Sequence, residues 1–353
     1  MRARRRAPLA AAAAVTSAMM LAACGSVGES GGGAAGSDGN GGGDGGQIEI
    51  GLVPKVEGIS WFQRMEEGVT SFDEDHEDVS AFQTGPDSED AAKQVAVIED
   101  LIAQNVDAIV VVPNDPQAVA PVLERARNNG IVVVTHEAPA LAGTESIDLD
   151  VEAFSNQEFG EQMFAPLAEA MGGEGQLVGE VGSLTSETHM AWYNAGLDYI
   201  EENYPDIEVV SDQPYEDNNS DSTARSNAQE ILRAYPDLAG FVGTSVSALA
   251  NFAAILEEQG NTDVATSGLS LPSIAGPYLD DGWITHAQTW DPAGAGYVSC
   301  YVAMQLVNGE DVATGDDLGY EGYDDVTVED GIVSGNATML LESGQFSDGE
   351  YPF

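Results

Sequence analysis

Lysine is nearly absent from this sequence of 353 residues and occurs only as Lys55 and Lys93. Together with arginine it makes 11 basic residues against 60 acidic ones, and the formal net charge is −49. Residues 1–23 carry four arginines and no acidic residue, so the chain after them has 7 basic and 60 acidic residues, a charge of −53. A surface this negative argues against binding nucleic acid, anionic membranes or anionic ligands such as phosphorylated sugars.

Cysteine and the usual catalytic motifs are also scarce. The sequence has two cysteines, Cys24 and Cys300, so we expect no structural disulfide, and we place Cys300 in a helical core. None of the four histidines has the spacing of a metal site, no G-x-S-x-G nucleophile elbow occurs, and no phosphate-binding glycine loop follows the first predicted strand. We therefore predict that the protein is not an enzyme and needs neither metal nor cofactor.

The first 47 residues predict export and a lipid anchor. A basic start and a short apolar run, "APLAAAAAVTSAMMLAAC", are typical of a secretory signal. The closing "LAAC" resembles the bacterial lipobox, in which the cysteine is lipidated; the alternative is an ordinary cleavage site with a chance cysteine. We expect a signal peptide over 1–23, lipidation at Cys24, and a flexible Gly/Ser-rich tether over 24–47. The folded part would then work outside the cytoplasm, beside the membrane.

From Ile48 onward, short apolar runs alternate with amphipathic stretches. The runs "IEIGLV", "DAIVVVP" and "IVVVTHE" are predicted strands, and "WFQRMEEGVTSFDED" and "DAAKQVAVIEDLIAQN" are predicted helices. Continuous apolar strands are typical of parallel sheets covered by helices on both faces. About 300 folded residues fit two doubly wound sheets better than one large sheet. The fold class predicted is therefore α/β, with two doubly wound parallel-sheet lobes and a boundary after Glu137, where "APALAGTESIDLD" breaks the alternation.

Ligands in open α/β sheets bind outside the carboxyl ends of the strands, so the residues that follow the predicted strands are our candidates. Four aromatic residues also lie within a few residues of strand ends, where a flat apolar ring can stack on a sugar, although we expect one or two of them to be core. The candidate ligand-binding residues are Lys55, Trp61, Phe62, Asp115, His136 and Glu137 in the first lobe, and His189, Trp192, Ser245, Gln288, Trp290 and Asp291 in the second.

Several of these residues have a second interpretation. Asp115 precedes Pro116 at a predicted helix start, so it can cap the helix, accept hydrogen bonds from a vicinal diol, or do both. His136 and Glu137 can be solvated loop residues rather than ligand contacts. Asp115 and Glu137 can also be the carboxylate pair of a glycosidase, but paired carboxylates bind a polyol equally well.

The two-lobe alternation, the lipobox and the tether resemble the solute-binding lipoproteins of bacterial ABC sugar importers, of the ribose-binding type. The stretches "IGLVPKVEGISWF", "IEDLIAQNVDAIVVVPND", "VVVTHEAP" and "VGSLTSETHMAW" look closest to rhamnose-binding proteins. Autoinducer-2-binding proteins are similar through "VPK", "TWD" and the final "YPF". Lys55 matches the lysine that this second group uses on its ligand, and Glu137 stands where it has an aspartate. Thr188 and His189 replace its Asp-Gln pair, which argues against autoinducer 2.

In the ribose-binding type, Asp115 matches a sugar-binding aspartate and Gln288 a glutamine on the hinge side of the cleft. The arginine of that type has no counterpart in "SLTSETHM", which argues against ribose. The resemblance implies the type I periplasmic binding protein fold, with a first lobe of 48–137 plus about 291–322 and a second of 138–290 plus about 323–353. It also implies a monomer whose lobes close about a hinge on the ligand.

We therefore expect a receptor that captures a neutral monosaccharide, with rhamnose or a similar deoxysugar or polyol favoured, and delivers it to an ABC permease and its ATPase. A receptor for the quorum signal autoinducer 2 is the alternative, and a secreted glycosidase is a third hypothesis. In the cleft, Lys55 would be a hydrogen-bond donor and a counter-charge for Asp115 and Glu137. On this interpretation Lys55→Ala weakens ligand binding far more than folding.

Overall fold

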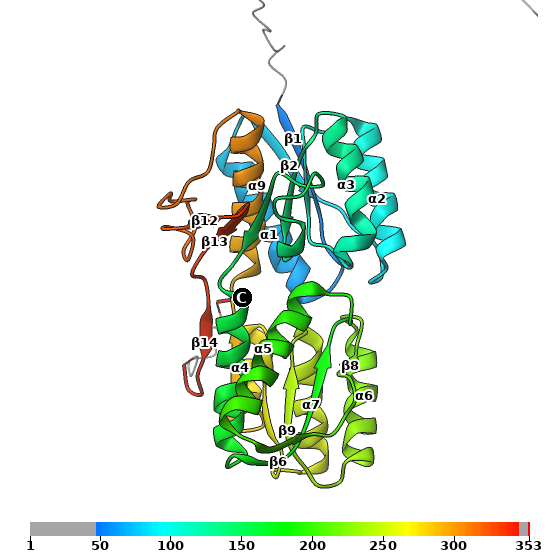
Figure 1. Cartoon of the computed structure of the whole chain (residues 1–353), viewed down its shortest axis with the longest axis vertical. Helices are drawn as coiled ribbons and strands as arrows, with labels where there is room; N and C mark the ends of the chain where they lie inside the picture. The colour runs from blue at the N-terminus through cyan, green and yellow to red at the C-terminus, as the bar shows by residue number, and fades with distance from the viewer. Residues whose placement is uncertain (1–46, 346–351) are drawn as a thin grey trace, which may run out of the picture. The chain divides into compact units, whose positions relative to one another are not determined.

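The computed structural model describes residues 47–345 and 352–353 (Figure 1). The predicted signal peptide, the lipidation site Cys24 and residues 24–46 of the predicted tether lie outside the described residues. Within the described part, two seven-stranded sheets are built almost entirely from parallel neighbours, each with helices packed on its faces. The predicted fold class, two α/β lobes with mainly parallel sheets, is confirmed. No helix in this part of the chain is long and apolar enough to cross a bilayer.

The first sheet has the strand order β12-β13-β5-β4-β3-β1-β2, and only the β12–β13 pair is antiparallel. The inner strands have continuous apolar runs because helices cover both faces of the sheet. Ala108–Val111, for example, is buried at every position. The strands are β1 (Ile48–Val53), β2 (Val79–Gln83), β3 (Ala108–Val111), β4 (Val132–His136), β5 (Leu149–Glu152), β12 (Thr327–Glu329) and β13 (Ile332–Ser334). The helices of this lobe are α1 (Ser60–Asp75), α2 (Ala91–Gln104), α3 (Pro116–Asn128), the 3-10 turn η1 (Pro139–Leu141) and α9 (Pro292–Val307).

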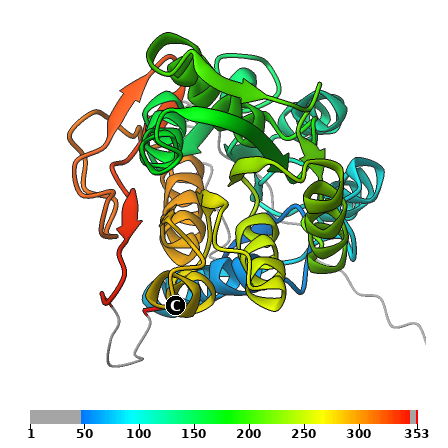
Figure 2. The same cartoon turned by 90° about the horizontal axis from the view of Figure 1, so that it is seen from below.

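The second sheet has the order β14-β11-β10-β9-β6-β7, with β8 pairing on β6, and only β14 is antiparallel to its neighbour. Its helices lie on both sides of the sheet (Figure 2). The strands are β6 (Glu174–Val181), β7 (Asp206–Val209), β8 (Tyr215–Glu216), β9 (Leu238–Gly243), β10 (Ala265–Leu269), β11 (His286–Thr289) and β14 (Met339–Leu341). The helices are α4 (Asn156–Ala170), α5 (Glu187–Asn203), α6 (Asp221–Ala234), α7 (Val246–Gln259) and α8 (Pro272–Asp280).

The chain passes between the two sheets three times, in segments 153–155, 290–291 and 335–338. The predicted lobe limits differ from this arrangement. Residues 138–152 and 323–334 were expected in the second lobe, whereas β5, β12 and β13 belong to the first sheet. The stretch after Glu137 breaks the alternation because it is the connection from β4 to β5 within one lobe. The proposed limit of the first lobe therefore moves to about residue 152, with β12 and β13 returning to it.

Helices α1 and α9 pack closely on one face of the first sheet, although more than 200 residues separate them in the sequence. A Cβ atom on Gly68 would lie 1.9 Å from the carbonyl oxygen of Ala293, so only glycine allows this approach. The contact fixes the start of α1, which carries Trp61 and Phe62, beside the crossing segment that carries Trp290.

Candidate functional site

A small cavity lies between side chains that follow the strands of both sheets. Its free volume is about 10 Å³, which is about enough for one water molecule. Six of its lining residues are apolar and four are polar. They are Ile59, Trp61, Phe62, Val246, Leu269 and Trp290, and Lys55, Glu137, His189 and Asn219. A larger groove of about 910 Å³ is lined by Arg64 and Asp291 among other residues, and Asp291 is the one predicted site residue in its lining.

An ion pair between Lys55 and Glu137 forms the polar wall of this cavity. Lys55 follows β1 and Glu137 follows β4, so the carboxyl ends of two nearby strands bring them together. The Lys55 Nζ donates to Glu137 Oε2 at 2.5 Å, and the two side chains are only 3 % and 5 % exposed. Burial is the largest influence on the Glu137 carboxyl and acts to raise its pKa, but the charge and hydrogen bond of Lys55 together with His136 and His189 outweigh it and lower that pKa to about 2. Glu137 is therefore charged at neutral pH.

Glu137 has a strained backbone. Its φ of 62° lies in the left-handed region, which is uncommon for any residue but glycine. Such a conformation costs on the order of 1–3 kcal/mol and persists where surrounding contacts hold it, often at functional sites. Here the contacts to its carboxylate come from both lobes.

The start of helix α5 supplies the second-lobe contacts to the ion pair. Lys55 Nζ also donates to Ser186 Oγ at 3.2 Å, and Thr188 Oγ1 donates to Glu137 Oε2 at 3.1 Å. Both hydroxyl residues are fully buried. The positive end of the α5 dipole therefore faces the carboxylate, which favours the charged form of Glu137. Neither Ser186 nor Thr188 is among the ligand-binding residues predicted from the sequence.

The hydrogen bonds of the two buried histidines set their tautomers. Gly182 N donates to His189 Nδ1 at 3.1 Å, so the proton of neutral His189 is on Nε2. His136 Nδ1 lies 2.7 Å from the carbonyl oxygen of Val151, so here the proton is on Nδ1. Burial lowers the pKa of His189 to about 3 and also lowers the pKa of His136, which keeps both rings neutral at pH 7. His189 lines the cavity, and His136 stands behind it with its Nε2 3.8 Å from Glu137 Oε1.

Two buried amides hold the backbone on which Lys55 stands. Gln94 Nε2 donates to the carbonyl oxygens of Pro54 and Val112 at 3.0 and 2.8 Å, and its Oε1 accepts from Asn114 N at 2.9 Å. Asn114 Nδ2 then donates to the carbonyl oxygen of Lys55 at 2.9 Å. The ends of β1 and β3 are thereby joined. Sequence reasoning missed Gln94, because a glutamine inside an amphipathic helix gives no signal of its own.

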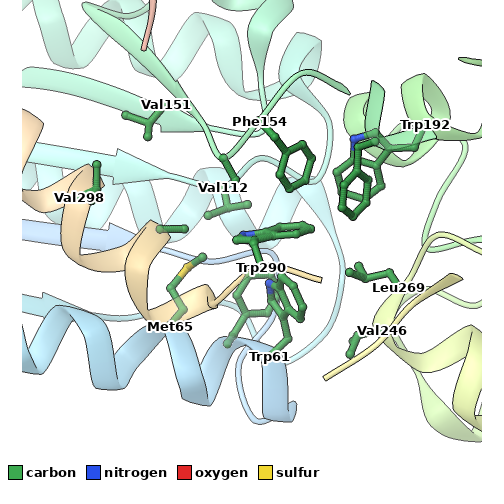
Figure 3. Packing of buried hydrophobic residues seen from close by; sticks show 14 of the residues in the cluster. Trp61, Met65, Val112, Val151, Phe154, Trp192, Val246, Leu269, Trp290 and Val298 are labelled. Atoms are coloured by element: carbon green, nitrogen blue, oxygen red, sulfur yellow. The ribbon is translucent and has the colours of Figure 1, made fainter. Parts of the chain in front are cut away.

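Three of the predicted aromatic residues line the cavity, and one does not. Trp61 and Trp290 meet edge to face with ring centroids 4.5 Å apart, and Leu269 and Val246 of the second lobe lie beside them (Figure 3). Trp192 is 1 % exposed and lies outside the cavity lining. Its Nε1 donates to Asn156 Oδ1 at 2.5 Å, so the structure assigns it to the core.

Three predicted polar residues are used as helix caps instead. Asp115 Oδ1 accepts from Gln117 N and Ala118 N at the start of α3, and Ser245 Oγ accepts from Ala248 N at the start of α7. Asp291 caps α9 and also receives a bidentate ion pair from Arg64 at 2.9 and 2.7 Å and the hydroxyl of Tyr320. None of the three lines the cavity.

Gln288 is likewise placed away from the cavity. It is fully buried in β11, and its Nε2 donates to the carbonyl oxygen of Phe159 in α4 at 2.7 Å, inside the second lobe. The cavity positions that sequence reasoning did not select are Ile59, Asn219, Val246 and Leu269. Val246 and Leu269 stand at strand ends, as the selected residues do, but their apolar side chains give no signal of hydrogen bonding to a ligand. No group of three or more His, Cys, Asp or Glu residues in the described part is arranged to hold a metal ion.

Comparison with known families and structures relates this two-lobed architecture to binding proteins. A family model described as "Periplasmic binding protein domain" matches residues 50–311. A xylitol-binding protein of Mycolicibacterium smegmatis is 27 % identical over 265 residues, which are 72 % of this chain and 68 % of that protein. A D-ribose/D-allose-binding protein of Pseudomonas aeruginosa is 34 % identical over 87 residues, and this match spans only 24 % of the chain and 27 % of that protein.

Two solved structures share the fold. The solute-binding protein of an ABC transporter from Clostridium phytofermentas, with bound L-rhamnose, has a TM-score of 0.77 and 20 % identity, covering 86 % of this chain and 98 % of that one. LsrB from Clostridium saccharobutylicum, in complex with AI-2, has a TM-score of 0.77 and 22 % identity, covering 87 % and 100 %. At this level of identity the likeness establishes the fold.

Proposed function

Because this chain belongs to the periplasmic binding protein domain family, we propose that it captures a neutral monosaccharide outside the cytoplasm and delivers it to an ABC permease and its ATPase. The observation that carries the proposal is the buried Lys55–Glu137 ion pair, set in an aromatic cavity to which both lobes contribute. The family consists of substrate-binding proteins, and we propose that this member binds its ligand without converting it. We further propose that it acts as a monomer held at the membrane through Cys24.

The charges around the cavity favour an uncharged ligand. Lys55 and Glu137 neutralise each other, and His189 is neutral, so a charged ligand would bring an unpaired charge into a buried site. The chain's overall charge adds long-range repulsion for anions. A polyol instead finds a charged donor in Lys55 and a charged acceptor in Glu137, each able to form a strong hydrogen bond to a hydroxyl.

The division of the cavity into polar and apolar parts supports a ligand with one hydroxylated edge and one apolar face. Trp61, Phe62 and Trp290 offer ring surface, and Val246 and Leu269 add an aliphatic wall from the second lobe. A deoxysugar such as rhamnose has a methyl group for such a wall and hydroxyls for the ion pair. We therefore favour rhamnose or a similar deoxysugar or polyol. The rhamnose complex among the related structures and the xylitol-binding relative agree with this choice.

Ligand entry needs a change in the distance between the lobes. The cavity volume of about 10 Å³ is far below the roughly 300–1,000 Å³ of typical ligand pockets. The three crossing segments are where such a movement can be absorbed, as in hinge closure around ligands. We propose that the lobes part, admit the sugar and close on it, and that the permease recognises the closed form.

Autoinducer 2 is the second candidate ligand. The fold likeness to the AI-2 complex and the position of Lys55 support it. Against it, Thr188, which donates to Glu137, and His189, which accepts from Gly182, replace the Asp-Gln pair of autoinducer-2-binding proteins.

A calorimetric and thermal-shift screen tests the proposal. Purified protein is titrated with L-rhamnose, L-fucose, D-ribose, xylitol and AI-2, and a binder raises the melting temperature through mass action. We expect a deoxysugar or polyol to bind, with Trp61→Leu weakening the affinity at least tenfold. Trp283→Leu is the matched control, because Trp283 packs in the second lobe outside the cavity. Binding of AI-2 alone would move the second candidate to first place, and no shift with any polyol would refute the sugar proposal.

A further inference from the structure

Glu89 and Asn219 meet across the two lobes. Glu89 lies in the connection from β2 to α2, and Asn219 lies in the connection from β8 to α6. Asn219 Nδ2 donates to Glu89 Oε2 at 2.5 Å. Asn219 also lines the cavity, so one amide side chain contacts both the candidate site and the opposite lobe.

The loop that carries Asn219 is built to hold it in place. Asn218 and Asn219 both have left-handed backbones, with φ of 53° and 49°, a conformation that asparagine adopts more readily than most residues. The fully buried Asp217 fixes the loop, because its Oδ1 accepts from Asn219 N at 2.8 Å. Ser245 Oγ donates to the other Asp217 oxygen, which ties the loop to the start of α7.

The position of the contact in the two sheets places it opposite the hinge. In the first sheet the crossing segment follows β5, and Glu89 follows β2, which is the edge strand at the far end. In the second sheet two crossing segments adjoin β11 and β14 at one end, and Asn219 follows β8 beside β6 at the other. When lobes turn about a hinge, the side away from it separates most. The Glu89–Asn219 contact therefore stands at the mouth of the cleft.

The carboxylate of Glu89 depends on this contact. Its Oε1 is buried and has no hydrogen-bond partner among the described residues, so the bond from Asn219 is the hydrogen bond that its buried part receives. The charge of Lys55 attracts it, while Glu216 and Glu137 repel it. Separation of the lobes would return Glu89 to water, and closure without Asn219 would leave it desolvated and unpaired.

We propose that Glu89 and Asn219 form a gate at the mouth of the cavity that sets the rate at which the ligand leaves. The inference rests on the proposed function for the existence of a ligand, but it names residues that the ligand need not touch. The bond exists only when the lobes meet, so it stabilises the closed complex and has no counterpart in the open form. Its loss therefore appears in the dissociation rate, and the association rate stays the same.

The proposed gate is tested by measuring the dissociation rate of the ligand identified by the screen in stopped-flow experiments. Glu89→Ala should release the ligand about tenfold faster or more, with an association rate within about twofold of wild type. Glu89→Gln keeps an acceptor oxygen for Asn219 and should stay within about threefold. Glu66→Ala is the matched control, because Glu66 is an exposed acid on α1 whose side chain forms no hydrogen bond or ion pair within the described residues. An unchanged release rate in Glu89→Ala overturns the gate and leaves the proposed function standing. Equal acceleration in Glu89→Gln and Glu89→Ala refutes the hydrogen bond as its basis.

Hydrogen exchange separates failure of the gate from failure of the sugar proposal. If no sugar, polyol or AI-2 binds, the proposed function is wrong, and the gate is judged without ligand. Glu89→Ala should then speed exchange in the backbone amides of 217–220, whereas Glu66→Ala should not. Unchanged exchange in that loop would overturn the gate by itself.

Discussion

Replacing Lys55 by methionine should destabilise the protein strongly at neutral pH, because Glu137 would remain as an unpaired buried charge. The pKa of Glu137 is lowered from 4.5 to about 2 in the folded protein. This difference of about 2.5 pKa units, at about 1.36 kcal/mol per unit, means that ionisation of Glu137 contributes roughly 3 kcal/mol to the stability of the folded chain, with Lys55 as the main favourable partner. Breaking a buried pair from one side typically costs about 3–5 kcal/mol. We expect Lys55→Met to lose an amount in this range at pH 7.

The pH dependence gives the sign of the effect. In the wild type the pKa is lowered, so the stabilisation is present above pH 4.5 and is lost as the pH falls towards 2. In Lys55→Met, burial acts without the lysine charge and raises the pKa of Glu137, so the loss of stability is largest at neutral pH and shrinks on acidification. Urea unfolding of the wild type and of Lys55→Met at pH 7 and at pH 4.5 measures the loss of stability at each pH.

Two controls make the test specific. The double variant Lys55→Met/Glu137→Gln has no buried charge left and should recover most of the lost stability. Lys93→Met removes the only other lysine, which is exposed on α2, and should unfold at the same urea concentration as the wild type. A Lys55→Met protein as stable as the wild type at pH 7, or a loss that does not shrink at pH 4.5, would refute the reasoning. The buried pair also revises the expectation that Lys55→Ala spares folding.

Three further predictions concern residues that support the site. Burial raises the pKa of Asp150 to about 7, and burial with the charge of Asp150 raises that of Glu152 well above its usual range, so their contribution to stability falls as the pH rises above about 4.5. Glu152→Gln should therefore lose less stability than the wild type between pH 5 and pH 8 in urea unfolding. Trp192→Phe removes the bond to Asn156 and should cost about 1–2 kcal/mol in thermal unfolding, with ligand affinity within about twofold. Gln94→Met leaves three buried backbone groups unpaired and should cost about 3 kcal/mol or more in urea unfolding.

Most of the fold could be read from the sequence, because continuous apolar strands leave little choice. Ile109 to Val112 and Val133 to Val134 are all buried, and their runs stand out from the amphipathic helices between them. Strand β5 was not predicted in this way. Its sequence "LDVE" carries Asp150 and Glu152, which are typical of a loop, yet both are buried on one face of the strand. Burial raises the pKa of both carboxyls, and protonated carboxyls cost far less to bury than charged ones.

The sequence predicted the location of the candidate site better than the set of residues that form it. The rule that ligands bind at the carboxyl ends of strands leads to Lys55, Glu137 and His189, which line one cavity. The same ends also carry Asp115 and Ser245, which cap helices. Caps and ligand contacts use the same residue types at the same distance from a strand, so composition and spacing alone do not separate them. Whether such a residue caps a helix or contacts the ligand depends on the direction in which its side chain points. Contacts from distant parts of the chain set that direction.

Because lysine is nearly absent, chemical modification of the chain's lysines can report the proposed opening of the lobes. An amine-reactive acylating reagent finds two lysine side chains, and Lys55 is 2 % exposed between the lobes while Lys93 is on the surface. Acylation of Lys93 then measures the dose of reagent, and if the lobes part as proposed, acylation of Lys55 measures the time that they spend apart. Mass spectrometry of the two peptides would give the ratio directly. A protein that almost lacks lysine thus allows the proposed hinge motion to be tested without any engineered label.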